Sequence, residues 1–184
     1  PMPLPTGLGS EAAGVVEAVA EDVTAVKVGD RVVYTGRPTD SYSDRRNFDA
    51  GQLVPIPNDI EDDQAAALFL KGLTAWYLLR KSYKVQSGDN ILLHAAAGGV
   101  GLIACQWASH LGANIIGVVS TEEKAALAKS HGCNHIIMAD DDIAEKVLIY
   151  TNGEGVAAVY DSIGRDTFFA SLNSLRPHGV MVTF

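Results

Sequence analysis

The sequence predicts an α/β protein in which a doubly wound parallel sheet follows part of a β-rich domain. Strand and helix patterns alternate regularly from residue 90 to residue 184, which is typical of a parallel sheet with helices on both faces. Residues 1–58 instead carry short β-branched runs punctuated by Pro and Gly. With 184 residues, of which 47% are hydrophobic and 20% charged, the chain can bury a sizeable core.

The character of the chain changes near Pro57. Before it, Gly14–Val19 and Arg31–Tyr34 have the pattern of short strands. After it, an acidic start at residues 61–63 opens two helical stretches that run toward Lys84. We therefore expect a partial β-rich domain in residues 1–60 and a parallel-sheet domain, led by bridging helices, in residues 61–184.

The segment after Asn90 supplies the alternating elements of the predicted sheet. Five strands are expected where the complete form of such a sheet has six, and nothing follows the last strand to cover it. The chain is therefore expected to be a fragment of a longer protein. The predicted strands are 90–94, 114–119, 135–138, 156–160 and 179–184, and the predicted helices are 100–111, 122–131, 142–150 and 166–174.

Composition argues against several classes of partner. A net charge of −8 and a pI near 5.0 oppose a phosphate backbone, and no basic cluster exceeds Arg45-Arg46, so nucleic acid is not an expected partner. Cys105 and Cys133 form no C-x-x-C motif, which favours a reducing, cytoplasmic setting over a disulfide framework. No signal-like stretch opens the chain and no apolar run of about 18 residues occurs, so no membrane attachment is expected.

A glycine-rich loop, Ala95-Ala96-Ala97-Gly98-Gly99-Val100-Gly101, joins the strand at 90–94 to the next helix. Aligned on G-x-G-x-x-G, the first glycine is replaced by Ala96, while Gly98 and Gly101 fill the second and third places. Gly98 lets the backbone approach a pyrophosphate, and Gly101 lets the helix pack close to the strand. Helix N-terminal amides then face the anion. The loop predicts a Rossmann dinucleotide site, with an ordinary strand-to-helix turn as the alternative.

The end of the second strand indicates which dinucleotide is held. An NAD-preferring fold places Asp or Glu about 20 residues past the loop, to bind the ribose 2′-hydroxyl. Here that position is Ser120, which does not repel a 2′-phosphate, and Lys124 one helical turn on can supply a positive charge. This favours NADP(H). Ser120 and Glu123 also fit a capping box with Lys124 solvated, and the two interpretations can coexist.

Five segments, in order and at matching spacing, resemble the zeta-crystallin-like quinone oxidoreductases of the medium-chain dehydrogenase/reductase superfamily. The likeness covers nearly all 184 residues. It implies that residues 1–60 are part of a GroES-like catalytic domain and that residues 61–184 are a Rossmann NADP(H)-binding domain, incomplete at its C-terminus. Family members are longer at both ends. The segments are Leu8–Val16, Val28–Val32, Leu70–Ala75, His94–Gly101 and Tyr160–Gly164.

The resemblance also implies a protein without metal. Zinc-dependent alcohol dehydrogenases of this superfamily carry a metal-binding His just before the position of Glu11, and here that residue is Ser10. The segment His131-Gly132-Cys133-Asn134-His135 looks like a ligand cluster, but it spans a helix end and a strand start with no fourth ligand nearby, so we interpret it as structural.

The resemblance assigns cofactor contacts residue by residue. Thr74 and Tyr77 have an alternative as ordinary helix-face residues, and Ile163 as a core residue. One departure weakens the phosphate site, because the family often has a Tyr where this chain has Ala139, followed by three aspartates. The implied contacts are Thr74 and Tyr77 near the cofactor, Gly98, Gly99, Val100 and Gly101 against the pyrophosphate, Ser120, Thr121, Glu122, Glu123 and Lys124 around the 2′-phosphate, and Ile163 beside a ribose.

The expected activity is reduction of a quinone by electron or hydride transfer from NADPH, without metal. No convincing Ser-His-Asp triad or carboxylate pair is evident, so the cofactor carries the chemistry. Tyr42 and Tyr77 are the candidate catalytic residues, as aromatic or hydroxyl contacts in an interdomain cleft. The alternatives are an NADPH-dependent alkenal or enone reductase and a non-catalytic NADPH-binding protein. A homodimer or tetramer is expected for the full-length protein.

Overall fold

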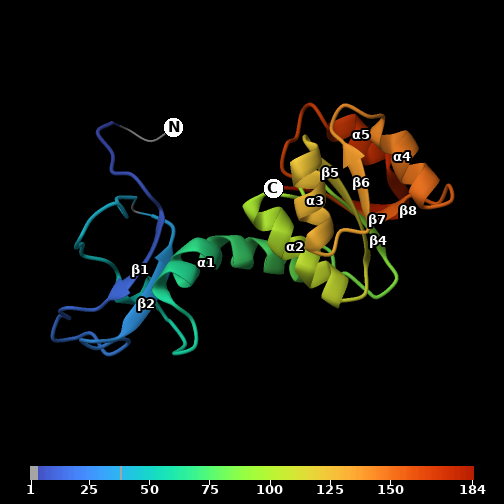
Figure 1. Cartoon of the computed structure of the whole chain (residues 1–184). Helices are drawn as coiled ribbons and strands as arrows, with labels where there is room; N and C mark the ends of the chain where they lie inside the picture. The colour runs from blue at the N-terminus through green and yellow to red at the C-terminus, as the bar shows by residue number, and fades with distance from the viewer. Residues whose placement is uncertain (1–3, 38) are drawn as a thin grey trace. The chain divides into compact units, whose positions relative to one another are not determined.

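The computed structural model describes residues 4–37 and 39–184, which form two compact units (Figure 1). The first unit ends at Lys71 and the second comprises Gly72–Phe184, so the boundary falls inside helix α1 (Asp62–Tyr77). Each unit has its own sheet and its own hydrophobic core. No helix of the described residues is long and apolar enough to cross a membrane.

The first unit contains a small antiparallel sheet in the order β1-β2-β3. Its middle strand, β2, carries the buried side chains Val32, Val33 and Tyr34. The strand predicted at 14–19 lies at residues 11–15 instead, because these are the residues that pair in register with β2. The elements are β1 (Glu11–Val15), β2 (Arg31–Thr35), η1 (Ala50–Gln52) and β3 (Val54–Pro55).

Helix α1 is continuous where the sequence predicts two stretches. Gly72 lies in its interior and does not interrupt it, because glycine costs a helix only about 1 kcal/mol relative to alanine. A π-helical turn, η2 (Leu78–Ser82), follows directly and buries Leu78 and Leu79.

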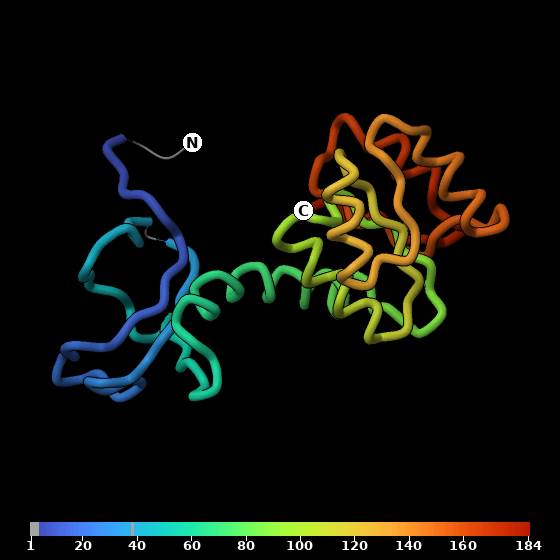
Figure 2. Tube along the Cα trace, viewed as in Figure 1, coloured from blue at the N-terminus to red at the C-terminus, as the bar shows by residue number. Residues whose placement is uncertain are grey.

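The second unit is a five-stranded parallel sheet in the order β6-β5-β4-β7-β8, with a helix between each pair of successive strands (Figures 1 and 2). This confirms the predicted Rossmann arrangement. Strands and helices are β4 (Asn90–Leu93), α2 (Gly99–His110), β5 (Asn114–Val119), α3 (Glu122–Ser130), β6 (His135–Met138), α4 (Ile143–Tyr150), β7 (Val156–Asp161), α5 (Phe168–Asn173) and β8 (Leu175–Thr183).

Strand β8 begins four residues before the predicted start at 179. Val156 pairs with Leu175 and Ala158 with Val180, so the ladder shifts register between them. Such an irregularity accommodates the extra residues, and His178 within it has a positive φ of 64°. The residues just before the predicted strand are therefore a bulge inside β8.

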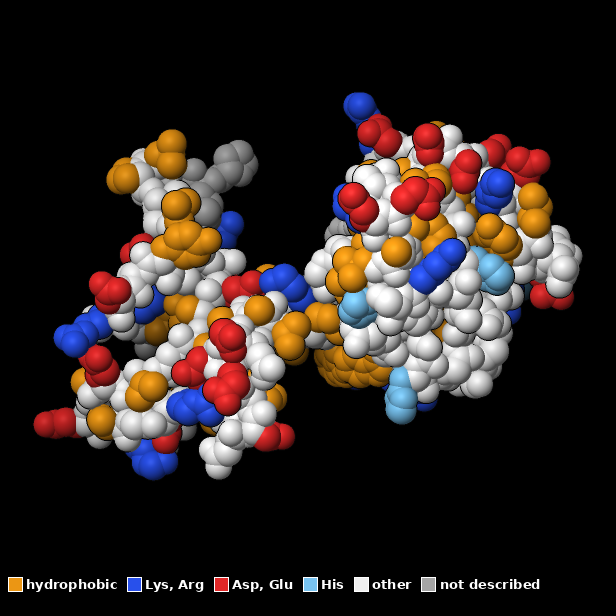
Figure 3. Space-filling model, viewed as in Figure 1, with side chains coloured by type: hydrophobic (Ala, Val, Ile, Leu, Met, Phe, Trp, Pro, Cys, Tyr) orange, Lys and Arg blue, Asp and Glu red, His pale blue; other side chains and the backbone are white. Residues whose placement is uncertain are grey.

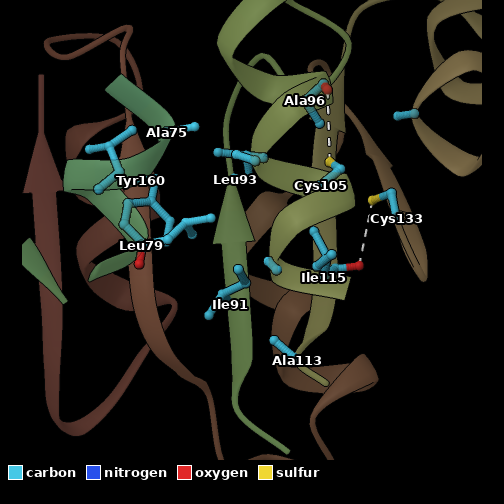
Figure 4. Packing of buried hydrophobic residues seen from close by; sticks show 14 of the residues in the cluster. Ala75, Leu79, Ile91, Leu93, Ala96, Cys105, Ala113, Ile115, Cys133 and Tyr160 are labelled. Carbon is cyan, nitrogen blue, oxygen red and sulfur yellow. Dashed lines mark hydrogen bonds between the residues drawn. The ribbon is translucent and has the colours of Figure 1, made fainter. Parts of the chain in front are cut away.

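The parallel sheet has a core on each face because successive strand residues point to opposite sides. Ile91, Leu93 and Ile115 pack with α2 and α3, as Figure 4 shows for the strand residues and Cys105. Leu92 and Ile116 pack on the other face with residues of α4. Each fully buried aliphatic side chain contributes roughly 2 kcal/mol of hydrophobic stabilisation. The strand ends are thereby held in fixed positions.

The direction in which successive strands are added to the sheet reverses at β4. This strand pairs with β5 on one edge and with β7 on the other. The connections from β4 lead one way through β5 to β6, and then return to β7 on the opposite side. In open α/β sheets, ligands bind outside the carboxyl ends of the strands at such a switch point. The candidate site therefore lies where β4 and β7 end.

Candidate functional site

The glycine loop follows β4 at its carboxyl end. Ala95 adopts a positive φ of 50°, and the fully buried Ala96 donates its backbone N–H to Val118 at 3.1 Å, which ties the loop to β5. Gly98 is the N-cap of α2, and no side chain caps this helix. The first amides of a helix have no acceptor within it, so the α2 N-terminus presents N–H groups and partial positive charge at the switch point.

Gly101 is required by close packing between α2 and the loop. A Cβ at this position would overlap the carbonyl oxygen of Ala95 and lie 2.6 Å from that of Ala96. The expected role of this third glycine is thus supported by the contacts. Sequence reasoning missed Gly117 in β5, where a Cβ would lie 2.6 Å from Cys133 Sγ and 2.7 Å from Ala96 Cβ. In the sequence it is marked only as the glycine that interrupts the β-branched run of β5.

Ser120 and Lys124 are brought together at the end of β5. Lys124 Nζ donates to Ser120 Oγ at 3.0 Å, and both residues are exposed. The capping-box interpretation with Ser120 as the cap is wrong, because α3 begins at Glu122 and its N-cap is Thr121. The Thr121 side chain accepts from the Lys124 backbone N–H at 3.2 Å. Ser120 thus lies one residue before the N-cap, and its hydroxyl accepts a hydrogen bond from the Lys124 ammonium instead.

Ala139 lies beside this pair. Its backbone N–H donates to the Val119 carbonyl at 2.8 Å, so the end of β6 adjoins the end of β5. Exposed acidic residues surround the same edge, at 122–123 and at 140–142. Figure 3 shows Asp and Glu side chains gathered along the upper edge of the second unit. Lys124 is therefore a cation within an acidic surface.

Asp161 ends β7 and is fully buried, with hydrogen bonds to the loop that follows it. Its Oδ1 accepts the backbone N–H groups of Ile163 at 2.9 Å and Gly164 at 3.0 Å. Its Oδ2 accepts the hydroxyls of Thr167 and Ser171, both at 2.7 Å. Burial alone would raise the pKa of Asp161, but these hydrogen bonds outweigh it and hold that pKa below its usual range.

His94 joins the same group from the end of β4. Its Nε2 lies 2.9 Å from Ser171 Oγ, and the side chain is buried. Burial lowers the pKa of His94, against a smaller opposing effect of the Asp161 carboxylate. The Ser171 hydroxyl donates to Asp161 rather than to His94, so this is not a nucleophile activated by a base. Sequence reasoning did not place Asp161 or Ser171 in a site.

The other predicted contacts are distributed over both units. In the first unit, Tyr42 is 81% exposed, and its ring lies against Gly9, where a Cβ would be 2.7 Å from Tyr42 Cδ1. In the second unit, Thr74 and Tyr77 lie on α1, and Tyr77 is 37% exposed. Ile163 is 52% exposed, which contradicts the alternative that it is a core residue.

The residues of the histidine-containing segment at 131–135 have separate partners. His131 Nδ1 lies 2.8 Å from the carbonyl oxygen of Leu127 near the end of α3, and the His135 ring stacks on Tyr150 with centroids 4.4 Å apart. Among the residues that the structure describes, no group of three or more His, Cys, Asp or Glu side chains is placed to hold a metal ion.

Comparison with known proteins agrees with this geometry. The family model for the alcohol dehydrogenase GroES-like domain matches residues 1–58, and that for the zinc-binding dehydrogenases matches residues 99–184. A quinone oxidoreductase of Pseudomonas aeruginosa is 50% identical over 98% of the chain. The chain belongs to the medium-chain dehydrogenase/reductase superfamily. Its expected relation to the quinone oxidoreductases of that superfamily is confirmed.

Two further relatives bear on cofactor and substrate. The crystal structure of Escherichia coli quinone oxidoreductase complexed with NADPH aligns with the whole chain at a TM-score of 0.96 and 49% identity. A 2-haloacrylate reductase from Burkholderia sp. is 49% identical over 98% of the chain. The chain spans 56% of the length of the Pseudomonas relative, 57% of the Escherichia coli structure and 55% of the haloacrylate reductase.

Proposed function

We propose that this chain binds NADPH and that its protein uses NADPH to reduce quinones. The observation that carries the proposal is the uncapped N-terminus of α2 at the switch point, joined to a glycine loop too tightly packed for a side chain at Gly101. The Ser120–Lys124 pair at the end of the neighbouring strand supports NADPH over NADH. The similarity to quinone oxidoreductases supports the acceptor.

The residues present fit this cofactor. The amides of Gly99 and Val100 at the α2 N-terminus are suited to hold the pyrophosphate, because helix N-termini favour anions. Lys124 and Ser120 offer an ammonium and a hydroxyl to the 2′-phosphate. The exposed side chain of Ile163, in the loop after β7, is available to a ribose. The remaining proposed contacts are Thr74, Tyr77, Gly98, Gly101, Thr121, Glu122 and Glu123.

Bound NADPH supplies a hydride, which together with one proton converts a quinone to a hydroquinone and leaves NADP⁺. The protein's part is to bind and orient the reactants and to limit access of water. We assign Tyr42 and Tyr77 as the candidate substrate contacts, since both side chains are aromatic, exposed and carry a hydroxyl.

The test uses the protein in its full natural length with 1,4-benzoquinone, following the loss of NADPH absorbance. Steady oxidation of NADPH, faster than that of NADH at equal concentration, is the expected result. Absence of turnover with quinones, enones and aldehydes would contradict an enzymatic function. Tight NADPH binding without such turnover would favour a non-catalytic NADPH-binding protein.

An activated alkene is the second candidate acceptor, favoured by the similarity to 2-haloacrylate reductase. Saturation of a carbon–carbon double bond conjugated to a carboxylate or carbonyl would use the same hydride on one carbon and one proton on the other, leaving NADP⁺. Parallel rates with 1,4-benzoquinone, 2-chloroacrylate and an alkenal distinguish the two. A kcat/KM for an alkene above that for every quinone tried would replace the quinone assignment.

A further inference from the structure

We propose that His94, Ser171 and Asp161 are positioning residues that set the spacing between the glycine loop and the loop at 162–167. The two loops follow adjacent strands, β4 and β7, on opposite sides of the switch point. The proposal rests on the proposed function, because these loops are its candidate cofactor contacts. All three side chains are buried, so they would act on the cofactor through the two loops and not by direct contact.

On the β7 side, Asp161 determines the conformation of the loop at 162–167. One carboxylate oxygen accepts consecutive backbone amides of Ile163 and Gly164, at 2.9 and 3.0 Å, and both oxygens accept the hydroxyl of Thr167. These bonds close the loop back onto the end of its own strand. Charge-assisted bonds of this kind are stronger than neutral ones, so the loop is held in one arrangement.

On the β4 side, the hydrogen bond to Ser171 determines how the His94 ring is held. The single hydroxyl proton of Ser171 goes to Asp161 Oδ2 at 2.7 Å, so Ser171 Oγ can only accept from His94 Nε2–H at 2.9 Å. This fixes the imidazole as the Nε2–H tautomer. Its Nδ1 is buried without a hydrogen-bond partner, so the Nε2 bond is the hydrogen bond that fixes the rotation of the buried ring.

The next residue shows why the orientation of His94 matters to the glycine loop. Ala95 has a positive φ of 50°, a conformation that residues other than glycine adopt only when their neighbours are held. The His94 backbone N–H is bonded to the Tyr160 carbonyl in β7 at 3.0 Å, and its side chain reaches Asp161 at the end of β7 by way of Ser171 on α5. The hydrogen bonds through Ser171 thus connect His94, which precedes the glycine loop, to Asp161, which holds the loop at 162–167.

The first experiment measures this connection without cofactor. In Ser171→Ala, hydrogen exchange should accelerate at residues 95–99 and at 163–164 together, because His94 Nε2 loses its acceptor and Asp161 loses a donor. Ser174→Ala is the matched control: Ser174 is also fully buried near the end of α5, but its hydroxyl bonds only the Ala170 carbonyl, at 2.7 Å. Equal exchange in the two variants at both loops would overturn the proposal.

The second experiment measures cofactor binding and turnover by the protein in its full natural length. Ser171→Ala should raise the Kd and KM for NADPH about tenfold while leaving kcat and the KM for quinone unchanged, since one charge-assisted bond is lost. Thr167→Val, at a half-buried site, should shift the same two constants in the same direction if Ser171→Ala fails to fold. Ser174→Ala should leave them unchanged.

The possible failures are distinguishable. Wild-type protein that does not bind NADPH would overturn the proposed function. Wild-type binding with an unchanged NADPH Kd in both Ser171→Ala and Thr167→Val would overturn the positioning role alone. A lower melting temperature with unchanged KM for NADPH would show that the three residues stabilise the fold and do not position the cofactor loops.

Discussion

Lys124 is the residue on which the proposed choice of cofactor depends most. It is exposed at the start of α3 and donates to Ser120, in a region that otherwise carries acidic side chains. The backbone dipole of α3 adds partial positive charge at the same end. An isolated ammonium beside a hydroxyl can bind a phosphate dianion, whereas NADH offers only a neutral 2′-hydroxyl at the same place.

Replacing Lys124 with alanine should therefore weaken NADPH binding about tenfold and leave NADH binding unchanged, because only NADPH carries the 2′-phosphate. Fluorescence titration at low and at high salt measures both dissociation constants. Lys129→Ala, in the last turn of the same helix, is the control for net charge. Equal losses for the two variants would show that overall charge, rather than a local contact, controls binding.

Ala139 offers a gain-of-function test of the same site. Its backbone is bonded to Val119, next to Ser120, so a longer side chain there starts beside the proposed phosphate position. Ala139→Tyr should lower the NADPH Kd about threefold by adding a hydroxyl donor. Ala139→Phe, which lacks the hydroxyl, is the matched control. If the two variants bind NADPH equally, the hydroxyl makes no contact with the phosphate.

His94 gives the stability a defined pH dependence. Its pKa in the folded protein lies below the ordinary value of 6.5, because burial disfavours the charged ring. The unfolded chain therefore binds a proton more readily, so stability is full above about pH 6.5 and falls as the pH drops toward the folded pKa. The melting temperature should decline over this range and the decline should be smaller in His94→Gln. Exposed His110→Gln serves as control, and an unchanged slope in His94→Gln would contradict the assignment.

At the scale of elements, the contact between α2 and the glycine loop positions the candidate site. The helix begins one residue after Gly98, and its first turn lies directly on the carbonyl groups of Ala95 and Ala96. The lack of a side chain at Gly117 in β5 leaves room for the Ala96 side chain. Two glycines on different elements thus permit the loop to lie between a helix and a strand.

Gly101→Ala and Gly72→Ala form a matched pair for this argument. Both glycines lie in helices, but a Cβ at Gly72 meets nothing within 4 Å, while at Gly101 it overlaps backbone oxygens. Gly72→Ala should stabilise the protein by about 0.5–1 kcal/mol. Gly101→Ala should destabilise it by about 2 kcal/mol and weaken NADPH binding. Denaturant unfolding measures both, and a neutral Gly101→Ala would show that α2 can move away from the loop freely.

The glycine loop and the elements after it could be predicted from sequence because their signals are local. β-branched runs, Gly98 and the segment after Val119 mark strand and helix ends to within a residue or two, except at the start of β8, where the bulge adds four residues to the strand. Ser171 could not be predicted, because its bond to His94 joins positions 77 residues apart and nothing in the pattern of α5 marks it. The capping-box alternative at Ser120 is wrong by one residue, because Thr121 offers the same kind of hydroxyl oxygen and the sequence pattern does not distinguish the two.

At the scale of the molecule, the two units differ in how much core supports them. The second unit has buried clusters on both faces of its sheet, and β4 is paired on both edges. The buried cluster of the first unit consists of Val33, Ile56 and Ala65, with Ala13 and Phe69 partly buried against it. Cooperative stability follows buried apolar contact, so the two sheets should not open with equal ease.

Hydrogen exchange of the 184-residue chain should therefore show a graded pattern. Amides of β4 and β7 should exchange at least about a hundredfold more slowly than those of β1 and β2, because opening the central strands exposes both cores whereas opening β1 exposes one small cluster. Mass spectrometry of peptides from each strand measures this, and low denaturant should accelerate β1 and β2 first. Equal protection of β1 and β4 would mean that the two units unfold as one cooperative body, so that the small core of the first unit does not limit its stability.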